Sequence, residues 1–404
     1  MASTKKDPVL VILQLTGAND YLNTIIPYTN PLYWDNRPKV NIPEELVVPI
    51  DDELAFRSDM EPLKDLYDQG KLAIINGIGF DNSPRSHFRA MDIWHTCEPD
   101  RIGTEGWVGK VIRDLDPSGE NVLKGVNFGQ GLPRAMTMRG VPVTSVNHLA
   151  TYGVFSSVSG IKSAEERTQL LDSFARMYAP AIGTGPTMEY LGQTGLDALR
   201  GADIIKTAPQ QYSSTVEYPT NAIATSLKDV AQVHLAGLGT QVFYTSHGPF
   251  DTHFNQGGSH TKLWQDISGA VDSFFADLRE HDAGDNIVMM LFSEFGRRVR
   301  DNGTGTDHGA AGVAFVIGDQ VKGGMYGAYP SLKPEDLTQG DLAPSYDFRG
   351  FYSTLVDRWL GLDAVPIVGG KFEQMAFVLS LATHTRRSGT PHADDRRRRT
   401  CLRL

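Results

Sequence analysis

A short stretch rich in glycine and asparagine carries three residues of the kind that bind metal ions. It reads LFSEFGRRVRDNGTGTDHGAA over residues 291–311, with Glu294 at the end of an apolar run and Asp307 beside His308 beyond a loop. Carboxylate oxygens and imidazole nitrogens are ligands of divalent ions such as Zn²⁺ and Mn²⁺. We therefore expect these three side chains to form one wall of a metal-binding pocket.

More acids and a histidine stand where other apolar stretches end. Asp20 follows the run Val9 to Leu13, and Asp251 and His253 close the weaker stretch 242–253. Acids in unrelated turns would not be expected to recur so regularly after successive candidate strands. The sequence predicts a site for one or two divalent ions (Zn, Mn or Ca), with the candidate ligands Asp20, Asp251, His253, Glu294, Asp307 and His308.

Ser86 offers a hydroxyl for chemistry at such a site. Pro84 restricts the residue before it to extended conformations, so a helix is expected to begin near Ser86. That helix is predicted to bury Phe88, Met91 and Trp94 on one face. A serine at its start lies near free N–H groups that favour anions. Two metal ions and a serine suit attack on a phosphate or sulfate ester.

Arginines next to Ser86 and Glu294 in the sequence add positive charge. An arginine fork matches the geometry of phosphate or sulfate, so Arg85 and Arg297 are candidate anion clamps, with Arg298 beside them. Together the catalytic candidates are Ser86, His87, Arg85 and Arg297.

Each candidate also has an ordinary structural interpretation. Asp20 in its turn would be a local cap, and Ser86 would be a helix N-cap. His87 would be a packing or surface histidine, and the arginines would form structural salt bridges. The joint pattern, and no single residue, is what favours a functional site.

The elements that must position these residues follow an α/β pattern. Unbroken apolar runs of the kind found in strands covered on both faces occur at 9–13, 72–80 and 286–295, and more weakly at 242–253 and 312–319. Helical patterns alternate with them at 61–70, 163–179, 226–239 and 260–282. This alternation predicts a mostly parallel sheet with helices on both faces. Sites in such sheets form at the carboxyl ends of the strands.

Composition limits the class of protein. The formal charge of −10 argues against nucleic acid as the main partner. No stretch is apolar for long enough to span a membrane, and two cysteines make no disulfide framework. We expect one domain over 8–380 with a helical or irregular insertion at about 115–225. The segment 384–404 holds seven arginines and two aspartates and is expected to be a disordered tail.

Several longer motifs carry a resemblance to a known family. They are LQLTGANDYLNTIIPY, SPRSHFRAMDIW, PFDTHFNQ, SEFGRRVRDNGTGTDHG and DFRGFYSTLVDRWLGLD. Together they resemble the domain of unknown function 1501 family, which is grouped with the sulfatase and alkaline phosphatase superfamily. The resemblance implies a three-layer α/β/α sandwich like that of alkaline phosphatase, with a two-metal site after the strands.

By matching position, the resemblance places the carboxylate after the first strand on Asp20 and the nucleophile on Ser86. It places an Asp/His pair on Asp251 and His253, with the late histidine on His308 and a further acid on Glu294. The chain departs from the superfamily in two places. One residue, not three, separates Asp251 from His253, and Ser293-Glu294 stands where an Asp-His pair is usual. His87 or Asp307 is the available replacement for the missing histidine.

Two functions are therefore open at this point. The first is a metal-dependent hydrolase or transferase that acts on a small anionic phosphate or sulfate ester through Ser86. The second is a non-catalytic binding or assembly protein that keeps the fold with a degenerate site; a protein partner is not identified. The chain as written carries no export signal and suggests the cytoplasm, whereas the family resemblance suggests export if the start is truncated.

Overall fold

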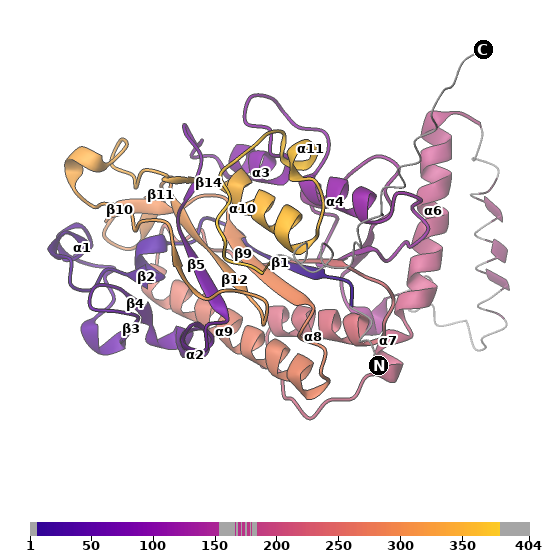
Figure 1. The fold of residues 1–404 in the computed structure, drawn as a ribbon, viewed down its shortest axis with the longest axis horizontal. Coiled ribbons are helices and arrows are strands. Elements are labelled where there is room, and N and C mark those ends of the chain that lie inside the picture. The colour runs from indigo at the N-terminus through magenta and orange to yellow at the C-terminus, as the bar shows by residue number, and fades with distance from the viewer. Residues whose placement is uncertain are drawn as a thin grey trace, which may run out of the picture.

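A nine-stranded sheet forms the centre of the protein (Figure 1). The computed structural model describes residues 6–152 and 184–379, together with isolated residues between 166 and 179. The Arg-rich segment 384–404 and most of the expected helix at 163–179 lie outside the described residues. The strands follow the order β13-β5-β12-β9-β1-β8-β6-β7, and β14 pairs with β5. Their bounds are β1 Val9–Leu15, β5 Leu72–Gly79, β6 Gly125–Phe128, β7 Thr144–Val146, β8 Val242–His247, β9 Ile287–Ser293, β12 Gly312–Ile317, β13 Gly324–Tyr326 and β14 Tyr346–Asp347.

Most pairings in this sheet are parallel. Only β12, among the described strands, runs antiparallel to its two neighbours, β5 and β9. Because β12 opposes both, β5 and β9 point the same way, and β1 and β8 run parallel to β9. The carboxyl ends of these four strands therefore meet at one edge of the sheet.

Helices cover both faces of the sheet and divide the core into two clusters. Alternate residues of β1 separate accordingly: Val11 and Leu13 pack in one cluster, and Leu10 and Ile12 pack in the other. On the first face lie α2 Glu61–Asp68, α8 Ala222–Leu235 and α9 Gln256–Glu280. On the second face lie α3 His87–Thr96, α4 Trp107–Leu115, α10 Phe348–Thr354 and α11 Ala364–Val368.

Smaller elements surround this sandwich. Two minor sheets consist of β2 Ile25–Ile26, β4 Ala55–Arg57 and β3 Val47–Pro49, and of β10 Arg297–Asp301 with β11 Thr306–His308. The remaining helices in the described part of the chain are α1 Pro31–Asn36, α6 Pro186–Ile205 and α7 Ala208–Gln211. Short 3-10 turns and one π-turn complete the chain at Tyr21–Asn23, Glu44–Leu46, Ser58–Met60, Arg134–Met136, Leu149–Thr151, Pro334–Asp336 and Leu355–Trp359.

The predicted fold class, a three-layer α/β/α sandwich with a mostly parallel sheet, is confirmed. All five apolar runs form strands of the central sheet, and the patterns at 61–70, 226–239 and 260–282 form α2, α8 and α9. The segment 115–225 differs in part from the expectation of a helical or irregular insertion. It supplies β6 and β7, which extend the central sheet beside β8. These strands have four and three residues, too few for their apolar positions to show a period.

The start of α3 also differs from expectation. The helix begins at His87, directly after Ser86, as predicted. Its buried face, however, carries Ala90, Ile93 and Trp94, while Phe88 is 92% exposed. The apolar face is thus set by the i, i+3, i+4 spacing from Ala90, and the first turn extends beyond the core.

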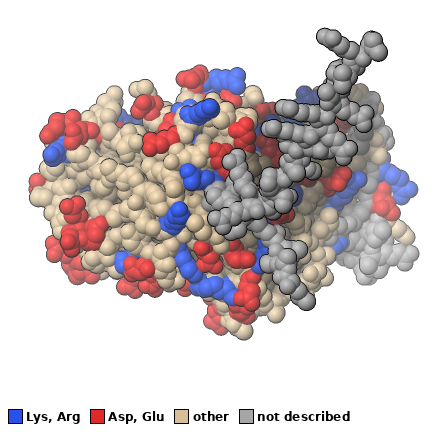
Figure 2. All heavy atoms as spheres, in the orientation of Figure 1, with Lys and Arg blue, Asp and Glu red and all other residues tan. Residues whose placement is uncertain are grey.

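The molecular surface mixes both signs of charge. On the face shown in Figure 2, acidic and basic side chains are interspersed, and acidic ones are the more numerous along its margin. Within the described part of the chain, every helix is too short or too polar to cross a bilayer.

A buried ion pair braces the loop that follows β1. Both oxygens of Asp20 accept hydrogen bonds from the guanidinium of Arg37, and both side chains are fully buried. The nitrogens of Arg37 also donate to the backbone oxygens of Val299 and Arg298, at 3.0 and 2.9 Å. Burial raises the pKa of Asp20, but the nearby Arg37 outweighs it and holds the pKa below its usual value. The pair therefore ties the β1 loop to β10.

We predict that Arg37→Met lowers the free energy of unfolding by about 3–5 kcal/mol, because it leaves the Asp20 carboxylate buried without a partner. Urea unfolding measures this cost. The control is Lys6→Met, which removes the exposed partner of Asp285 and should cost under about 1 kcal/mol. Adding Asp20→Asn to Arg37→Met should restore much of the loss. Equal costs for Arg37→Met and the control would contradict the bracing role.

Candidate metal centre

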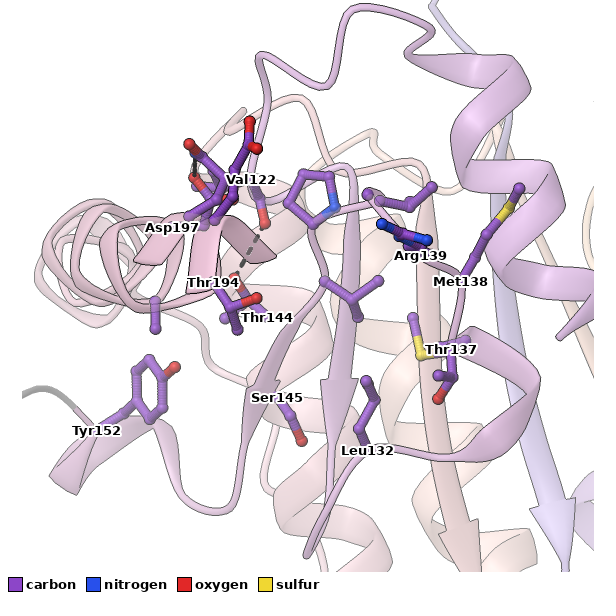
Figure 3. A pocket seen from close by; sticks show the side chains of 18 residues that line it. Val122, Leu132, Thr137, Met138, Arg139, Thr144, Ser145, Tyr152, Thr194 and Asp197 are labelled. Carbon is purple, nitrogen blue, oxygen red and sulfur yellow. Dashed lines mark hydrogen bonds between the residues drawn. The ribbon is translucent and has the colours of Figure 1, made fainter. Parts of the chain in front are cut away.

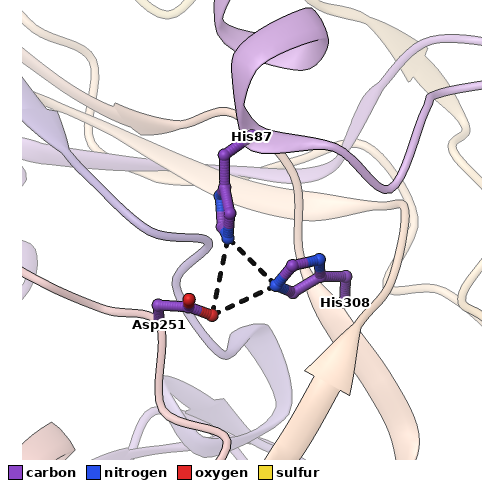
Figure 4. Close-up of side chains that lie close together, drawn as sticks. All are labelled: His87, Asp251 and His308. Carbon is purple, nitrogen blue, oxygen red and sulfur yellow. Dashed lines mark hydrogen bonds and ion pairs between the residues drawn. The ribbon is translucent and has the colours of Figure 1, made fainter.

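Three imidazoles and one carboxylate meet at the carboxyl edge of the sheet. We call His87, Asp251, His253 and His308 the His/Asp cluster. The Nε2 atom of His308 lies 2.9 Å from the Nε2 atoms of both His87 and His253. Oδ1 of Asp251 lies 3.4, 3.0 and 3.1 Å from Nε2 of His87, His253 and His308. Figure 4 shows His87, Asp251 and His308 pointing toward one another from three separate segments.

The order of the elements explains how residues so distant in sequence meet. His87 is the first residue of α3, in the connection after β5, and Asp251 and His253 lie in the loop after β8. His308 ends β11, where it pairs with Arg297 of β10. That hairpin follows β9 and folds back on itself. The loop 291–311 therefore returns His308 to the edge where β9 ended.

The second nitrogen of each ring faces an acceptor. Nδ1 of His87 lies 2.7 Å from Oε1 of Glu294. Nδ1 of His253 lies 3.0 Å from Oδ1 of Asp307, and Nδ1 of His308 lies 2.9 Å from the backbone oxygen of Arg85. A carboxylate or carbonyl only accepts, so each Nδ1 carries the hydrogen. In a neutral imidazole the remaining nitrogen, Nε2, then presents its lone pair.

This arrangement fits a metal ion. Lone pairs of Nε2 atoms 2.9 Å apart repel one another unless a cation or proton lies between them. In a tetrahedral site with ligands about 2.0–2.1 Å from the ion, neighbouring ligand atoms are about 3.3 Å apart. The spacings of 2.9 to 3.4 Å within the cluster are close to that value. Hydrogen bonds from the outer nitrogen of a ligand to a carboxylate or carbonyl are a regular feature of metal sites.

Among the described residues, His87, Asp251 and His308 also form a group whose ligand atoms all lie within 4.8 Å of one another. His253 adds a fourth donor that contacts two of the three, Asp251 and His308. The side chains of the cluster are 21–42% exposed, so solvent and substrate can reach them. An accessible cluster of this kind resembles a catalytic site more than a closed structural one.

Charges around the cluster shift the pKa of its members. The hydrogen bond to Glu294 raises the pKa of His87, although burial opposes it. Burial tends to raise the pKa of Asp251, but the hydrogen bond from Arg297 and the close approach of His308 lower it to about 2. Hydrogen bonds from His253 and Asn302 lower the pKa of Asp307. Asp251 and Asp307 are therefore both ionised at neutral pH.

Arg297 holds the cluster in place and is not an exposed anion clamp. Its side chain is fully buried, and its Nη2 atom lies 2.6 Å from Oδ1 of Asp251. Its nitrogens also donate to four backbone oxygens, at 2.7 to 2.9 Å, those of Gly17, Ala18, Phe250 and Thr306. The expectation that Arg297 grips a substrate anion therefore needs correction, because every nitrogen of the guanidinium already has a partner.

The other predicted residues divide into two groups. Glu294 is buried and accepts hydrogen bonds from Nδ1 of His87 and from the Gly17 N–H, and Asp307 accepts one from Nδ1 of His253. Both acids therefore hold rings of the cluster and do not face its centre themselves. Asp20 is committed to Arg37 and Gln256 and does not join the cluster. Gly17 allows the β1 loop to pass close to the site: at φ +105°, a Cβ there would lie 2.6 Å from the Asp251 nitrogen.

Ser86 and two arginines lie beside the cluster. Ser86 is exposed and makes no capping hydrogen bond to α3, so the N-cap interpretation does not account for its hydroxyl. Arg85, whose backbone oxygen binds His308, directs its guanidinium to Asp341 at 2.9 Å, and Arg298 approaches the same carboxylate at 3.5 Å. Two partly exposed arginines share one buried acid, which leaves a net positive charge. The role of Asp341 has no signal in the sequence, because it lies in a loop without a motif.

A separate cavity lies at the β7 edge of the sheet. It measures about 670 Å³, and its lining includes Thr144 and Ser145 of β7, Arg139, and Gln193 and Asp197 of α6 (Figure 3). None of its lining residues belongs to the His/Asp cluster. Size alone therefore does not locate the chemistry in this molecule.

Comparisons with known proteins agree with the predicted resemblance. Residues 206–366 match the family model described as Protein of unknown function (DUF1501), which confirms the resemblance over this part of the chain. The matched segment contains Asp251, His253, Glu294 and His308, whereas His87 lies outside it. No curated protein matches the sequence.

Solved structures similar to this chain include sulfatases and an alkaline phosphatase. A mutant of the alkaline phosphatase PafA has a TM-score of 0.42 and 8% identity, covering 94% of this chain and 99% of that one. PsFucS1 sulfatase from Pseudoalteromonas sp. has a TM-score of 0.40 and 12% identity, covering 92% and 71%. The C-terminal periplasmic domain of EcEptC from Escherichia coli, solved in complex with Zn, has a TM-score of 0.36 and 10% identity, covering 78% and 75%. Similarities this distant assign neither residues nor an activity to the present chain.

We predict that the purified protein, loaded with Zn²⁺ or Mn²⁺ and then dialysed, retains close to one ion per chain, and that His308→Ala abolishes this retention. His308 contacts all three other members of the cluster, so its loss opens the donor set. Elemental analysis measures the ion content. The control His281→Ala removes a histidine at the end of α9 and should leave the ion content unchanged. Equal retention by both variants would place the ion elsewhere.

We predict that Glu294→Gln weakens the metal affinity by roughly 10–100-fold, because the neutral amide supports the His87 ring less well than a carboxylate does. Competition with a chromophoric chelator gives the affinity. Asp341→Asn serves as the comparison, since Asp341 is a nearby buried acid that binds arginines and no ring of the cluster. An unchanged affinity in Glu294→Gln would show that His87 is not a ligand.

Proposed function

We propose that the protein is a metal-dependent hydrolase of phosphate or sulfate monoesters, with the His/Asp cluster as its metal site and Ser86 as its nucleophile. The observation that carries the proposal is the convergence of Nε2 lone pairs on the Asp251 carboxylate, with each outer Nδ1 held by an acceptor. Such an arrangement is stable only around positive charge.

Charge balance supports a divalent ion. Asp251, Glu294 and Asp307 bring three carboxylates, and the guanidinium of Arg297 compensates for one of them. If the imidazoles are neutral, the three carboxylates and the one guanidinium together have a net charge of −2. One divalent cation neutralises that charge. Calcium prefers oxygen ligands, so the imidazoles favour zinc or manganese. Because Asp20 is committed to Arg37, we propose one ion, held by His87, Asp251 and His308 with His253 beside them.

The groups around the cluster support an anionic substrate. Arg85 and Arg298 share the single carboxylate of Asp341 and are 35% and 38% exposed, so they can turn toward an incoming phosphate or sulfate. Ser86 is the N-cap residue of α3, and a helix N-terminus favours negative charge. A bound divalent ion would supply Lewis acidity, which activates a hydroxyl and stabilises the oxygens of the transferring group.

Ser86 completes the proposed reaction. Its hydroxyl is exposed and lies between Arg85 and His87 in sequence. Its oxygen would form a bond to phosphorus or sulfur as the bond to the ester oxygen breaks. The hydroxyl proton passes to solvent, and solvent returns a proton to the departing alcohol. Water then attacks the ester formed on Ser86 and releases the free acid and the serine. The residues that hold this geometry are Glu294, Asp307 and Arg297.

We predict that the zinc- or manganese-loaded protein hydrolyses 4-methylumbelliferyl phosphate or sulfate and that Ser86→Ala lowers kcat by at least about 10²–10³-fold, as expected for a group that acts in the transition state. The metal content should stay unchanged. The free energy of unfolding should change by less than about 0.5 kcal/mol, because Ser86 makes no capping hydrogen bond.

The matched control for this experiment is Ser83→Ala, in the same loop, which should keep full activity. Unchanged turnover in Ser86→Ala would show that Ser86 is not the nucleophile and would leave water as the attacking group. A protein that binds one ion but turns over neither ester would instead be the binding protein that the sequence left open.

A further inference from the structure

Two phenylalanines that adjoin histidines of the His/Asp cluster in the chain are the most exposed large apolar side chains among the described residues. Phe88 is 92% exposed and Phe254 is 76% exposed. Each directly follows a histidine of the cluster, Phe88 after His87 and Phe254 after His253. Burial of a phenylalanine normally stabilises a fold, so neither ring contributes to stability where it lies. Exposed apolar side chains next to potential metal ligands suggest a role in binding.

The residues that precede the two phenylalanines, His87 and His253, are held in place by hydrogen bonds. His87 is held by Glu294, and His253 by Asp307, while Asn302 donates to the backbone oxygen of His253 at 3.1 Å. Nε2 of both histidines contacts Nε2 of His308. Phe88 on α3 and Phe254 in the loop after β8 are therefore each carried by a segment that is fixed to the same cluster.

The side-chain amide of Asn302, next to His253, is already used. Asn302 donates to His253 and to Asp307, and its side-chain oxygen accepts from the N–H groups of Thr304 and Gly305. Recognition of a sugar needs free donors and acceptors around the site. The rings offer only apolar, flat surfaces. The arginines and the cluster would hold the acid group, so the rings face the alcohol portion of the ester.

We propose that Phe88 and Phe254 are specificity-determining residues and that the substrate is a monoester of an apolar alcohol, whose alkyl or aryl group contacts these rings. The proposal rests on the proposed ester hydrolysis and names its substrate class. Because both rings are exposed without a ligand, they contribute nothing to the fold and would be covered only when substrate is bound.

The test measures kcat/KM for methyl, propyl, butyl and hexyl phosphate and for the corresponding alkyl sulfates, using the metal-loaded full chain. These alcohols leave with similar ease, so a dependence on chain length reports contact with the protein. We expect kcat/KM to rise about two- to fourfold for each added methylene. In Phe88→Ala/Phe254→Ala the rise should flatten, while the rate with the methyl ester should stay within about twofold. Ile102→Ala, which removes another exposed apolar side chain (73%), is the control and should keep the full dependence.

A second readout separates this proposal from the proposed function. Calorimetry with alkylphosphonates and alkylsulfonates of the same chain lengths measures binding without turnover. Turnover of methyl esters with no dependence on chain length in either readout overturns the proposal and leaves the hydrolase intact. Affinity that rises with chain length and is lost in the double variant supports the apolar binding site. If no ester is hydrolysed in that case, only the proposed hydrolase function is contradicted.

Two further outcomes count against the proposal. Glucose 6-phosphate or glucose 6-sulfate turned over faster than the hexyl ester would assign the rings to a sugar. Sedimentation of the wild-type protein with phosphatidylcholine vesicles, lost in the double variant, would assign them to a lipid surface. Either result overturns an apolar alcohol as the ligand.

Discussion

The contact between Arg297 and Asp251 is the interaction on which the site depends. A guanidinium removed from water must find partners for its donors or lose the free energy of several hydrogen bonds. Arg297 meets this demand with the Asp251 carboxylate and with backbone oxygens from the loops after β1 and β8 and from β11. These are the segments that must approach one another for the cluster to exist. The same contact fixes the oxygen of Asp251 toward which three imidazoles point.

A rigid frame of buried charge therefore supports an accessible group of donors. Below the cluster, the pair of Asp20 and Arg37 fixes the β1 loop to β10, and Glu294 is buried behind His87. At the cluster itself, Asp251 and His253 are about two-fifths exposed. This division suits catalysis at a metal ion, since ligands must be held firmly while the reacting groups enter and leave. The residues next to the cluster in the chain differ in character, because Arg85 lies two residues before His87 and exposed phenylalanines directly follow His87 and His253.

Much of this arrangement could be predicted from residue type and position. Apolar runs identified the strands, and parallel strands bring their carboxyl ends together, so Asp251, His253, Glu294, Asp307 and His308 were expected at one edge. The roles within the group were harder to predict. Asp20 and Arg297 have the right chemistry for a ligand and a clamp, but Arg37 and the surrounding carbonyls engage them. His87, which the sequence offered both as a packing histidine and as a replacement ligand, lies in the cluster because α3 begins directly with it.

The sequence by itself determined the fold class and the edge at which the His/Asp cluster lies, because strand patterns and the residues after them are local properties of the chain. The tertiary structure alone decided which side chains share a hydrogen bond and which remain open to solvent. Asp20 and Asp251 look alike in sequence, yet a guanidinium 17 residues away neutralises the first and a ring of imidazoles surrounds the second. Phe88 fits a helical apolar face, but the rotation of α3 exposes it. Both outcomes depend on contacts between distant segments, which the local sequence does not encode.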